Sequence, residues 1–367
     1  MKKMLSLAAM LAVLSYASPA SAELKIGGDA AVRARGEYNT TKAAGALTST
    51  NTDDLKYQYR VRLKASSDLG DGYFFKALVL NETVPGVYTT VAANNTEVYQ
   101  LDVSNFYFGR TLKDSNYSIG RIPLNSFNNP IFDLALYPIP FVGRYAVDVP
   151  VATYNFDRVF GFNYGTKIGD GNLNTTLVVL DNNAPSATAV PGMLNDGYVL
   201  HVSYKTSVGD IAFEPQAIIS LTDAQGLTYQ RVSPNTFGFN ATIPTGSSKI
   251  GASAFYTVCK DSNGLSAGAR TTIDYSGYLL RLKAESGPAM AWVDYNRTSD
   301  KTPALDATYN NVFVWAQYNF KVHEAATGTF SVTPTIRYRT SGKDVVSVAG
   351  TDKNSQLRGE LYATVTF

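Results

Sequence analysis

Positively charged side chains alternate with apolar ones in the stretch LKYQYRVRLKA, residues 55–65. A period of two places successive side chains on opposite faces of a strand, so one face is apolar and the other strongly basic. The basic face carries Lys56, Gln58, Arg60, Arg62 and Lys64. A row of guanidinium and ammonium groups attracts anions, which is the chemistry that this stretch offers. In a soluble protein such a face would simply meet water, so the rest of the chain must decide its role.

Side chains that could catalyse a reaction are few. The two histidines are His201 and His323, and only His201 has a hydroxyl close by in sequence, that of Ser203. Residues two apart on a strand lie about 6.5 Å from each other, which is beyond hydrogen-bond reach for a Ser-His pair. We therefore predict no catalytic residue and expect that the protein is not an enzyme.

Residues that could bind a metal or cofactor are equally sparse. Cys259 is the single cysteine, so the chain forms no internal disulfide, and one cysteine with two distant histidines does not make a zinc site. Residues 169–174, GDGNLN, lack the closing glutamate of a calcium loop and fit a hairpin turn better. We expect no cofactor. The formal net charge of +2 also argues against a nucleic-acid partner.

The amino terminus has the pattern of a secretory signal peptide. A basic start, Met1-Lys2-Lys3, precedes an apolar run to about Leu14, and Ala20-Ser21-Ala22 supplies a small-x-small cleavage site. We predict a signal peptide over residues 1–22 and a mature domain over residues 23–367. The mature part has no apolar run of 18 or more residues, so we expect no membrane-spanning helix.

The elements that must position the basic row are β-strands. Segments of period two, bounded by Gly, Asp and Ser turns, follow one another along the mature chain and number about sixteen. Short turns alternate with longer loops throughout, as in outer-membrane barrels, which have periplasmic turns, extracellular loops and an even strand number. A barrel of this size is too wide for side chains to fill, so the polar face lines water and the apolar face meets lipid. The predicted fold class is all-β, a transmembrane antiparallel β-barrel.

Short motifs support the same architecture. They are the signal peptide, SIGRIPL at residues 118–124, and the terminal strand LYATVTF, which ends in Phe367. With them the mature chain resembles the general-diffusion porins of Gram-negative bacteria, sixteen-stranded barrels that usually assemble as trimers. The resemblance implies an outer-membrane location, a homotrimer, contacts with outer-membrane lipid and lipopolysaccharide, and recognition of Phe367 by the barrel-assembly machinery.

The resemblance also implies an internal constriction. Gly120-Arg121 matches a pair that commonly closes the strand before the third extracellular loop, and that loop, here roughly residues 125–153, would fold into the lumen. This segment lacks the Pro-Glu-Phe-Gly-Gly type motif of the best-known porins. It offers Asp133 and Asp148 as carboxylates opposing the basic wall, with Arg144 between them.

A pore wall follows from these assignments. The first two strands and the last become neighbours when a barrel closes, so their cations should gather on one lumen wall. The predicted pore-lining and constriction residues are Arg33, Arg35, Lys56, Arg60, Arg62, Arg121, Asp133, Arg144, Asp148 and Arg358. The excess of cations predicts a channel for passive diffusion of small hydrophilic solutes and ions, with a mild preference for anions.

Alternatives remain at this stage. The lumen carboxylates could pair with the cations and leave no net selectivity. A channel of the same fold could instead select phosphate, carboxylates or sugars. Phe313 and Trp315 also fall on the inward phase, where we expect them to pack under a loop as neighbours on one strand. An outer-membrane barrel enzyme and a purely structural or adhesive barrel are less favoured.

Overall fold

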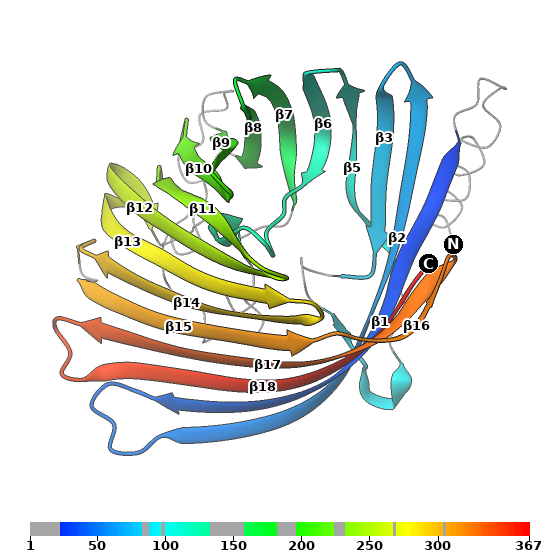
Figure 1. The fold of residues 1–367 in the computed structure, drawn as a ribbon. Coiled ribbons are helices and arrows are strands. Elements are labelled where there is room, and N and C mark those ends of the chain that lie inside the picture. Colours follow the sequence, from blue (N-terminus) through cyan, green and yellow to red (C-terminus); the bar gives the residue numbers. More distant parts are fainter. Residues whose placement is uncertain are drawn as a thin grey trace.

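The chain forms a closed antiparallel β-barrel of sixteen strands, as predicted (Figure 1). A computed structural model describes residues 23–82, 88–96, 100–132, 158–181, 196–223, 232–266, 269–303 and 306–367. The predicted signal peptide, residues 1–22, lies outside these ranges.

Eighteen strand elements make up the wall, and two of them continue the path of the element before them. β4 continues β3 alongside β2, and β16 continues β15 alongside β17. The elements are β1 (Leu24–Lys42), β2 (Thr50–Gly70), β3 (Tyr73–Leu80), β4 (Thr89–Thr90), β5 (Asp102–Thr111), β6 (Ser115–Pro123), β7 (Arg158–Ile168), β8 (Gly171–Asp181), β9 (Gly197–Val208), β10 (Ile211–Ser220), β11 (Asn235–Thr245), β12 (Ser248–Ser266), β13 (Ala269–Ser286), β14 (Ala289–Asp300), β15 (Ala307–Tyr318), β16 (Phe320–Ala325), β17 (Gly328–Val345) and β18 (Thr351–Thr366). Two short 3-10 helices, η1 (Ala93–Asn95) and η2 (Pro130–Phe132), lie between strands.

The barrel closes where the first strand meets the last. β1 pairs with β2 on one side and with β18 on the other, the latter from Asp29 opposite Thr366 to Lys42 opposite Lys353. Beyond the end of β18, Gly28 and Phe367 exchange both backbone hydrogen bonds, at 2.8 and 3.1 Å. Closure removes the sheet edges and pairs the backbone groups of the wall, which a hydrocarbon environment demands.

Short turns lie at one end of the barrel and most connections at the other end are longer, as the sequence predicts. Four two-residue turns begin with a glycine whose φ lies between 52° and 60°, followed by a residue without positive φ, the pattern of type II′ hairpins. These glycines are Gly169, Gly209, Gly246 and Gly287. The β2–β3 turn has Asp71 and Gly72 at φ 50° and 79°, as a type I′ turn requires. All five turns lie at the same end of the barrel as Phe367.

The burial of alternate side chains identifies the two faces of the wall. On β18, Leu357, Leu361 and Val365 are exposed, whereas Gln356 and Glu360, each directly before one of them, are buried. The exposed apolar row is therefore the outer surface of the barrel and the polar row faces the interior. Among the described residues no helix is long and apolar enough to cross a membrane.

The wall is taller on one side than on the other. β1 and β2 have 19 and 21 residues and β17 has 18, whereas β3 and β6 have 8 and 9. The β1–β2 and β17–β18 hairpins reach well beyond the shorter strands in Figure 1. About ten residues suffice for a tilted strand to cross a bilayer, so the tall side continues past that thickness.

Candidate functional site

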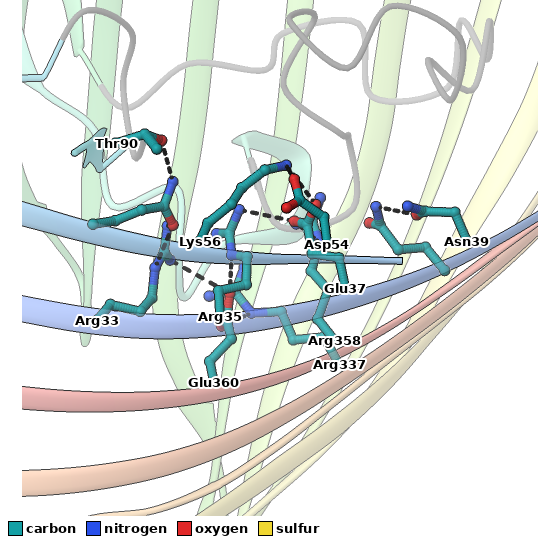
Figure 2. Close-up of polar contacts among 12 residues, drawn as sticks. Arg33, Arg35, Glu37, Asn39, Asp54, Lys56, Thr90, Arg337, Arg358 and Glu360 are labelled. Carbon is teal, nitrogen blue, oxygen red and sulfur yellow. Dashed lines mark hydrogen bonds and ion pairs between the residues drawn. The ribbon is translucent and has the colours of Figure 1, made fainter. Parts of the chain in front are cut away.

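The inner wall at the closing seam carries a cluster of charges, which we call the seam cluster. On β1, Arg33, Arg35 and Glu37 all face inward because they are two positions apart. β18 sets Tyr362, Glu360 and Arg358 opposite these three residues, in that order. β2 sets Gln58, Lys56 and Asp54 opposite them on the other side. Figure 2 shows that Arg33, Arg35, Glu37, Lys56, Arg358 and Glu360 lie close together over β1.

Glu360 is the centre of the seam cluster. Its fully buried carboxylate lies 3.5 Å from Arg33 Nη1, 2.6 Å from Arg35 Nε and 2.8 Å from Arg337 Nε. The Tyr362 hydroxyl donates a further hydrogen bond to it at 2.6 Å. A carboxylate withdrawn from water needs such partners to stay ionised at tolerable cost.

Glu37, the next inward residue of β1 after Arg35, is also shared by three cations. Its carboxylate lies 3.2 Å from Arg35 Nη1, 2.8 Å from Lys56 Nζ and 3.0 Å from Arg358 Nε. Arg337 and Arg358 stand directly opposite each other on β17 and β18. Like charges in that position repel, and the two glutamates offset the repulsion because each binds one of these arginines.

Ion pairs continue from the seam along β2. Arg62 Nη2 lies 2.8 Å from Asp29, and Arg60 bridges Asp29 at 3.6 Å and Glu82 at 3.3 Å. Glu82 also lies 3.8 Å from Arg158 on β7. Arg158 in turn hydrogen-bonds the Ser104 hydroxyl on β5. The charged network therefore extends from β17 across the seam to β7.

Cations outnumber carboxylates in this network. Within the described ranges its cations are Arg33, Arg35, Lys56, Arg60, Arg62, Arg158, Arg337, Arg339 and Arg358, and its carboxylates are Asp29, Glu37, Asp54, Glu82 and Glu360. Each of the two central glutamates is shared by three cations, so pairing does not cancel the charge. Lys56 and Arg62 keep about 30% of their side-chain surface exposed, which leaves positive charge available to solutes inside the barrel.

Six of the predicted lining residues come together in this network: Arg33, Arg35, Lys56, Arg60, Arg62 and Arg358. Asp133, Arg144 and Asp148 lie outside the described residues.

The placement of Arg121 on the lumen wall is wrong. Arg121 is exposed and stands opposite Phe106 on β5 and Phe160 on β7, two aromatic residues of the outer surface. Its neighbours Gly120 and Ile122 are buried and take the inward positions on β6. The period of two along residues 118–122 therefore points Arg121 outward.

Sequence reasoning missed three residues of the site, namely Glu82, Tyr88 and Arg158. Each stands at or beyond the end of a strand, where the alternation that identified the other lining residues has stopped. Tyr88 places its ring against Arg33 and Arg60. No sequence pattern marks these three positions, because their partners are distant in the chain.

The start of the segment after β6, residues 124–132, lies against the inner face about half way around the barrel from β1 and β2. Asn129 donates a hydrogen bond to Gln216 at 2.8 Å and accepts one from Asn240 at 3.1 Å. The ring of Phe132 packs edge-on against His201, with centroids 4.9 Å apart. An inward position of the rest of this loop, residues 133–157, remains a prediction, since those residues lie outside the described ranges.

Aromatic residues pack beneath this segment, as expected for Phe313 and Trp315. Trp292 and Trp315 stack with centroids 4.7 Å apart, and Phe127 packs edge-on against both, at 5.3 and 5.5 Å. The guanidinium of Arg337 lies 3.5 Å from the centroid of the Trp315 ring. This contact joins the aromatic group to the seam cluster.

The histidine considered for catalysis is part of this packing. His201 Nε2 lies 3.0 Å from Gln216 Oε1, and in the described part of the chain no hydrogen bond joins His201 to Ser203. Both side chains are buried against the wall.

Solved structures share this fold at low sequence identity. The anion-selective porin from Comamonas acidovorans superposes with a TM-score of 0.57 at 13% identity, over 95% of this chain and all of that one. The outer-membrane channel DcaP of Acinetobacter baumannii gives 0.54 at 13% identity, over 95% and 99%. Salmonella typhi OmpF, solved as a complex with daunomycin, gives 0.53 at 12% identity, over 93% and 98%.

Comparisons at the sequence level find nothing: no family model and no curated protein matches the chain. The sequence identity to these structures is too low for a function to be transferred, so the likeness concerns the fold alone. The chain therefore has the closed-barrel fold of outer-membrane porins and channels.

Proposed function

We propose that this protein is a water-filled outer-membrane channel for passive diffusion of small hydrophilic solutes and ions, with a preference for anions. The observation that carries the proposal is the seam cluster, in which two glutamates on the inner wall are each shared by three cations. Channels select by width and by the charge that lines them. An apolar outer face and a cation-rich inner face give a closed barrel the properties such a channel needs.

The location and assembly belong to the same proposal. We propose the outer membrane of a Gram-negative bacterium, export by the signal peptide of residues 1–22, and insertion by the barrel-assembly machinery through Phe367. A homotrimer in contact with lipid and lipopolysaccharide is the proposed assembly. One structure of the same fold, Vibrio cholerae OmpT, was solved in a trimer form. Migration of the purified protein on a gel without heating tests the trimer.

Conductance in a planar bilayer tests the channel. The purified protein should produce stepwise conductance, and a KCl gradient should give a reversal potential of the sign set by chloride. A potential of the opposite sign would contradict the anion preference. Purified, correctly folded protein that gives no conductance steps would contradict the channel itself.

A substrate-selective channel of the same fold is the second candidate. It is favoured by the proximity of cationic side chains and aromatic rings, with the Arg337 guanidinium over Trp315 and the Lys283 ammonium 5.9 Å from the ring centroid of Phe127. Phosphate or carboxylates would bind the cations, and sugars would stack on the rings. Chloride current that one such solute reduces in a saturable way would support this candidate over general diffusion.

A further inference from the structure

Tyr88 lies inside the barrel and covers two arginines of the charged network, one in the seam cluster and one further along β2. The guanidinium carbon of Arg33 is 4.2 Å from the centroid of its ring, and that of Arg60 is 4.5 Å from it. The ring of Tyr362 packs edge-on against it, with centroids 5.7 Å apart. Tyr88 itself is 6% exposed. One aromatic side chain therefore contacts cations from both β1 and β2.

The chain directly after Tyr88 is hydrogen-bonded to the wall. Thr89 and Thr90 pair with Tyr59 and Gln58 of β2, and Gln58 Nε2 donates a hydrogen bond to the Thr90 hydroxyl at 2.9 Å. The Val91 amide donates to the Tyr57 carbonyl at 2.9 Å.

A second anchor stands at the end of β3. The Asn81 side chain accepts a hydrogen bond from the Val61 amide at 2.7 Å and donates one to the Thr89 hydroxyl at 3.1 Å. Tyr88 thus directly precedes a strand segment that is hydrogen-bonded to β2 and to Asn81 at the end of β3, which holds its ring over the arginines.

The two arginines beneath the ring are less exposed than the next cation along β2. Arg33 and Arg60 keep 2% and 16% of their side-chain surface exposed, whereas Arg62, the next inward residue of β2, keeps 31%. No ring contact with Tyr88 is found for Arg62 among the described residues. An aromatic face attracts a guanidinium but displaces water and ions from it.

We propose that Tyr88 is a specificity-determining residue of the channel, which limits its anion preference by covering Arg33 and Arg60. This inference rests on the proposed diffusion function and adds to it a residue from the connection after β3. The ring reduces the number of guanidinium groups that a passing anion can approach. It also narrows the lumen beside β1 and β2, because it lies on the inner side of both strands.

The test is single-channel recording of Y88A, Y88F and the wild type in the same KCl gradient. We expect Y88A to raise the chloride-to-potassium permeability ratio about twofold, since each uncovered charge acts on ions a few ångströms away. Y88F keeps the covering ring and should restore the wild-type ratio. Y256A is the matched control, because Tyr256 lies on the outer face of β12 and is 49% exposed.

A second pair of variants separates uncovering from widening. In an R60S background, Y88A should raise the chloride-to-potassium permeability ratio less than it does in the wild type, because one of the two covered cations is gone. An undiminished gain would overturn the inference, because the ring would then act by width alone. Y88E, which places a carboxylate beside the same cations, should lower the ratio below that of the wild type.

The outcomes distinguish the inference from the function on which it rests. A wild-type protein without conductance would remove the channel proposal. If the wild type conducts but neither Y88A nor Y88E changes the chloride-to-potassium permeability ratio, the channel proposal stands and the proposed role of Tyr88 is overturned. Every variant that is recorded should also show the heat-dependent shift in gel migration that is typical of a folded barrel.

Discussion

Arg35 and Glu360 face each other across the seam between β1 and β18, with Arg35 Nε 2.6 Å from Glu360 Oε1. Arg33 and Arg337 bind the same carboxylate from either side. The pair therefore couples the closure of the barrel to the charge of its inner wall. Two different properties, stability and selectivity, should depend on one glutamate.

Glu360→Gln tests that coupling. The change leaves three guanidinium groups without their shared carboxylate, and removal of one partner of a buried ion pair costs about 3 kcal/mol of unfolding free energy. The same change should raise the preference for anions, because it removes a negative charge from the wall. Urea unfolding in detergent, followed by circular dichroism, gives the first quantity and the reversal potential gives the second.

Glu324→Gln is the matched control for this change. Glu324 is 61% exposed and pairs only with Lys321 in the described part of the chain. Exposed ion pairs contribute little, so neither the stability nor the potential should change. A Glu360→Gln variant that behaves like this control would show that the seam glutamate has no special role.

Arg60 and Arg62 should carry part of the anion preference. A unit charge about 6 Å from an ion in water contributes about 0.7 kcal/mol, roughly threefold in partition. We expect R60S and R62S together to reduce the chloride-to-potassium permeability ratio several-fold. R110S is the control, since Arg110 lies at the short-turn end and binds the Asp71 carbonyl at 3.0 Å. An unchanged ratio in the double variant would remove both arginines from the ion path.

Salt concentration provides an independent check on the same pair. The screening length falls from about 10 Å at 0.1 M salt to about 3 Å at 1 M. The wild-type preference should therefore weaken at the higher concentration, measured with the same concentration ratio across the bilayer. The anion preference of the double variant R60S/R62S should depend less on salt concentration.

Gly28 should be indispensable to closure. A Cβ at this position would lie 2.3 Å from the Arg62 carbonyl and 3.0 Å from the Phe367 ring, and a backbone oxygen cannot move aside cheaply. We expect Gly28→Ala to lower the yield of heat-modifiable, folded barrel on an unheated gel. Gly36→Ala on the same strand is the control, since its Cβ would meet only the Gly359 carbonyl, at 4.0 Å. Equal yields for the two variants would contradict this expectation.

Removal of the Phe127 ring should change the tryptophan fluorescence. The chain has two tryptophans, and both Trp292 and Trp315 pack against Phe127. Phe127→Ala opens this contact to water, so the emission should shift to longer wavelength and quenching by iodide should increase. Phe160→Ala on the outer face should leave the emission in place. An unshifted spectrum for Phe127→Ala would mean that another group shields both rings.

The architecture was predictable because alternation of side chains is a local property. The inward positions of Arg33, Arg60 and Arg358 follow from counting by two along long, regular strands. Arg121 shows the limit of that reasoning. Its place was inferred from a Gly-Arg motif, whereas counting along β6 sets it with the exposed Phe106 and Phe160.

Contacts made by connections were beyond prediction for a different reason. Tyr88 meets Arg33, 55 positions away, through the path of a segment that has no period. The polar stretch HEAATG, residues 323–328, favours a turn that begins at His323, and the structure places that turn later. β16 continues to Ala325 after a register shift between Lys321 and His323, so His323 is a strand residue opposite Phe330.

The seam has a consequence for the order of biosynthesis. Arg35 and Glu360 are 325 positions apart, so the last strand must be made before the pair can form. Bringing such distant strands together carries a large entropy cost and is slow. Until that step, the β1 arginines lack the glutamate that they later share. The arrangement of charges at the seam therefore cannot be complete before the first and last strands meet, and a barrel that fails to close would lack it.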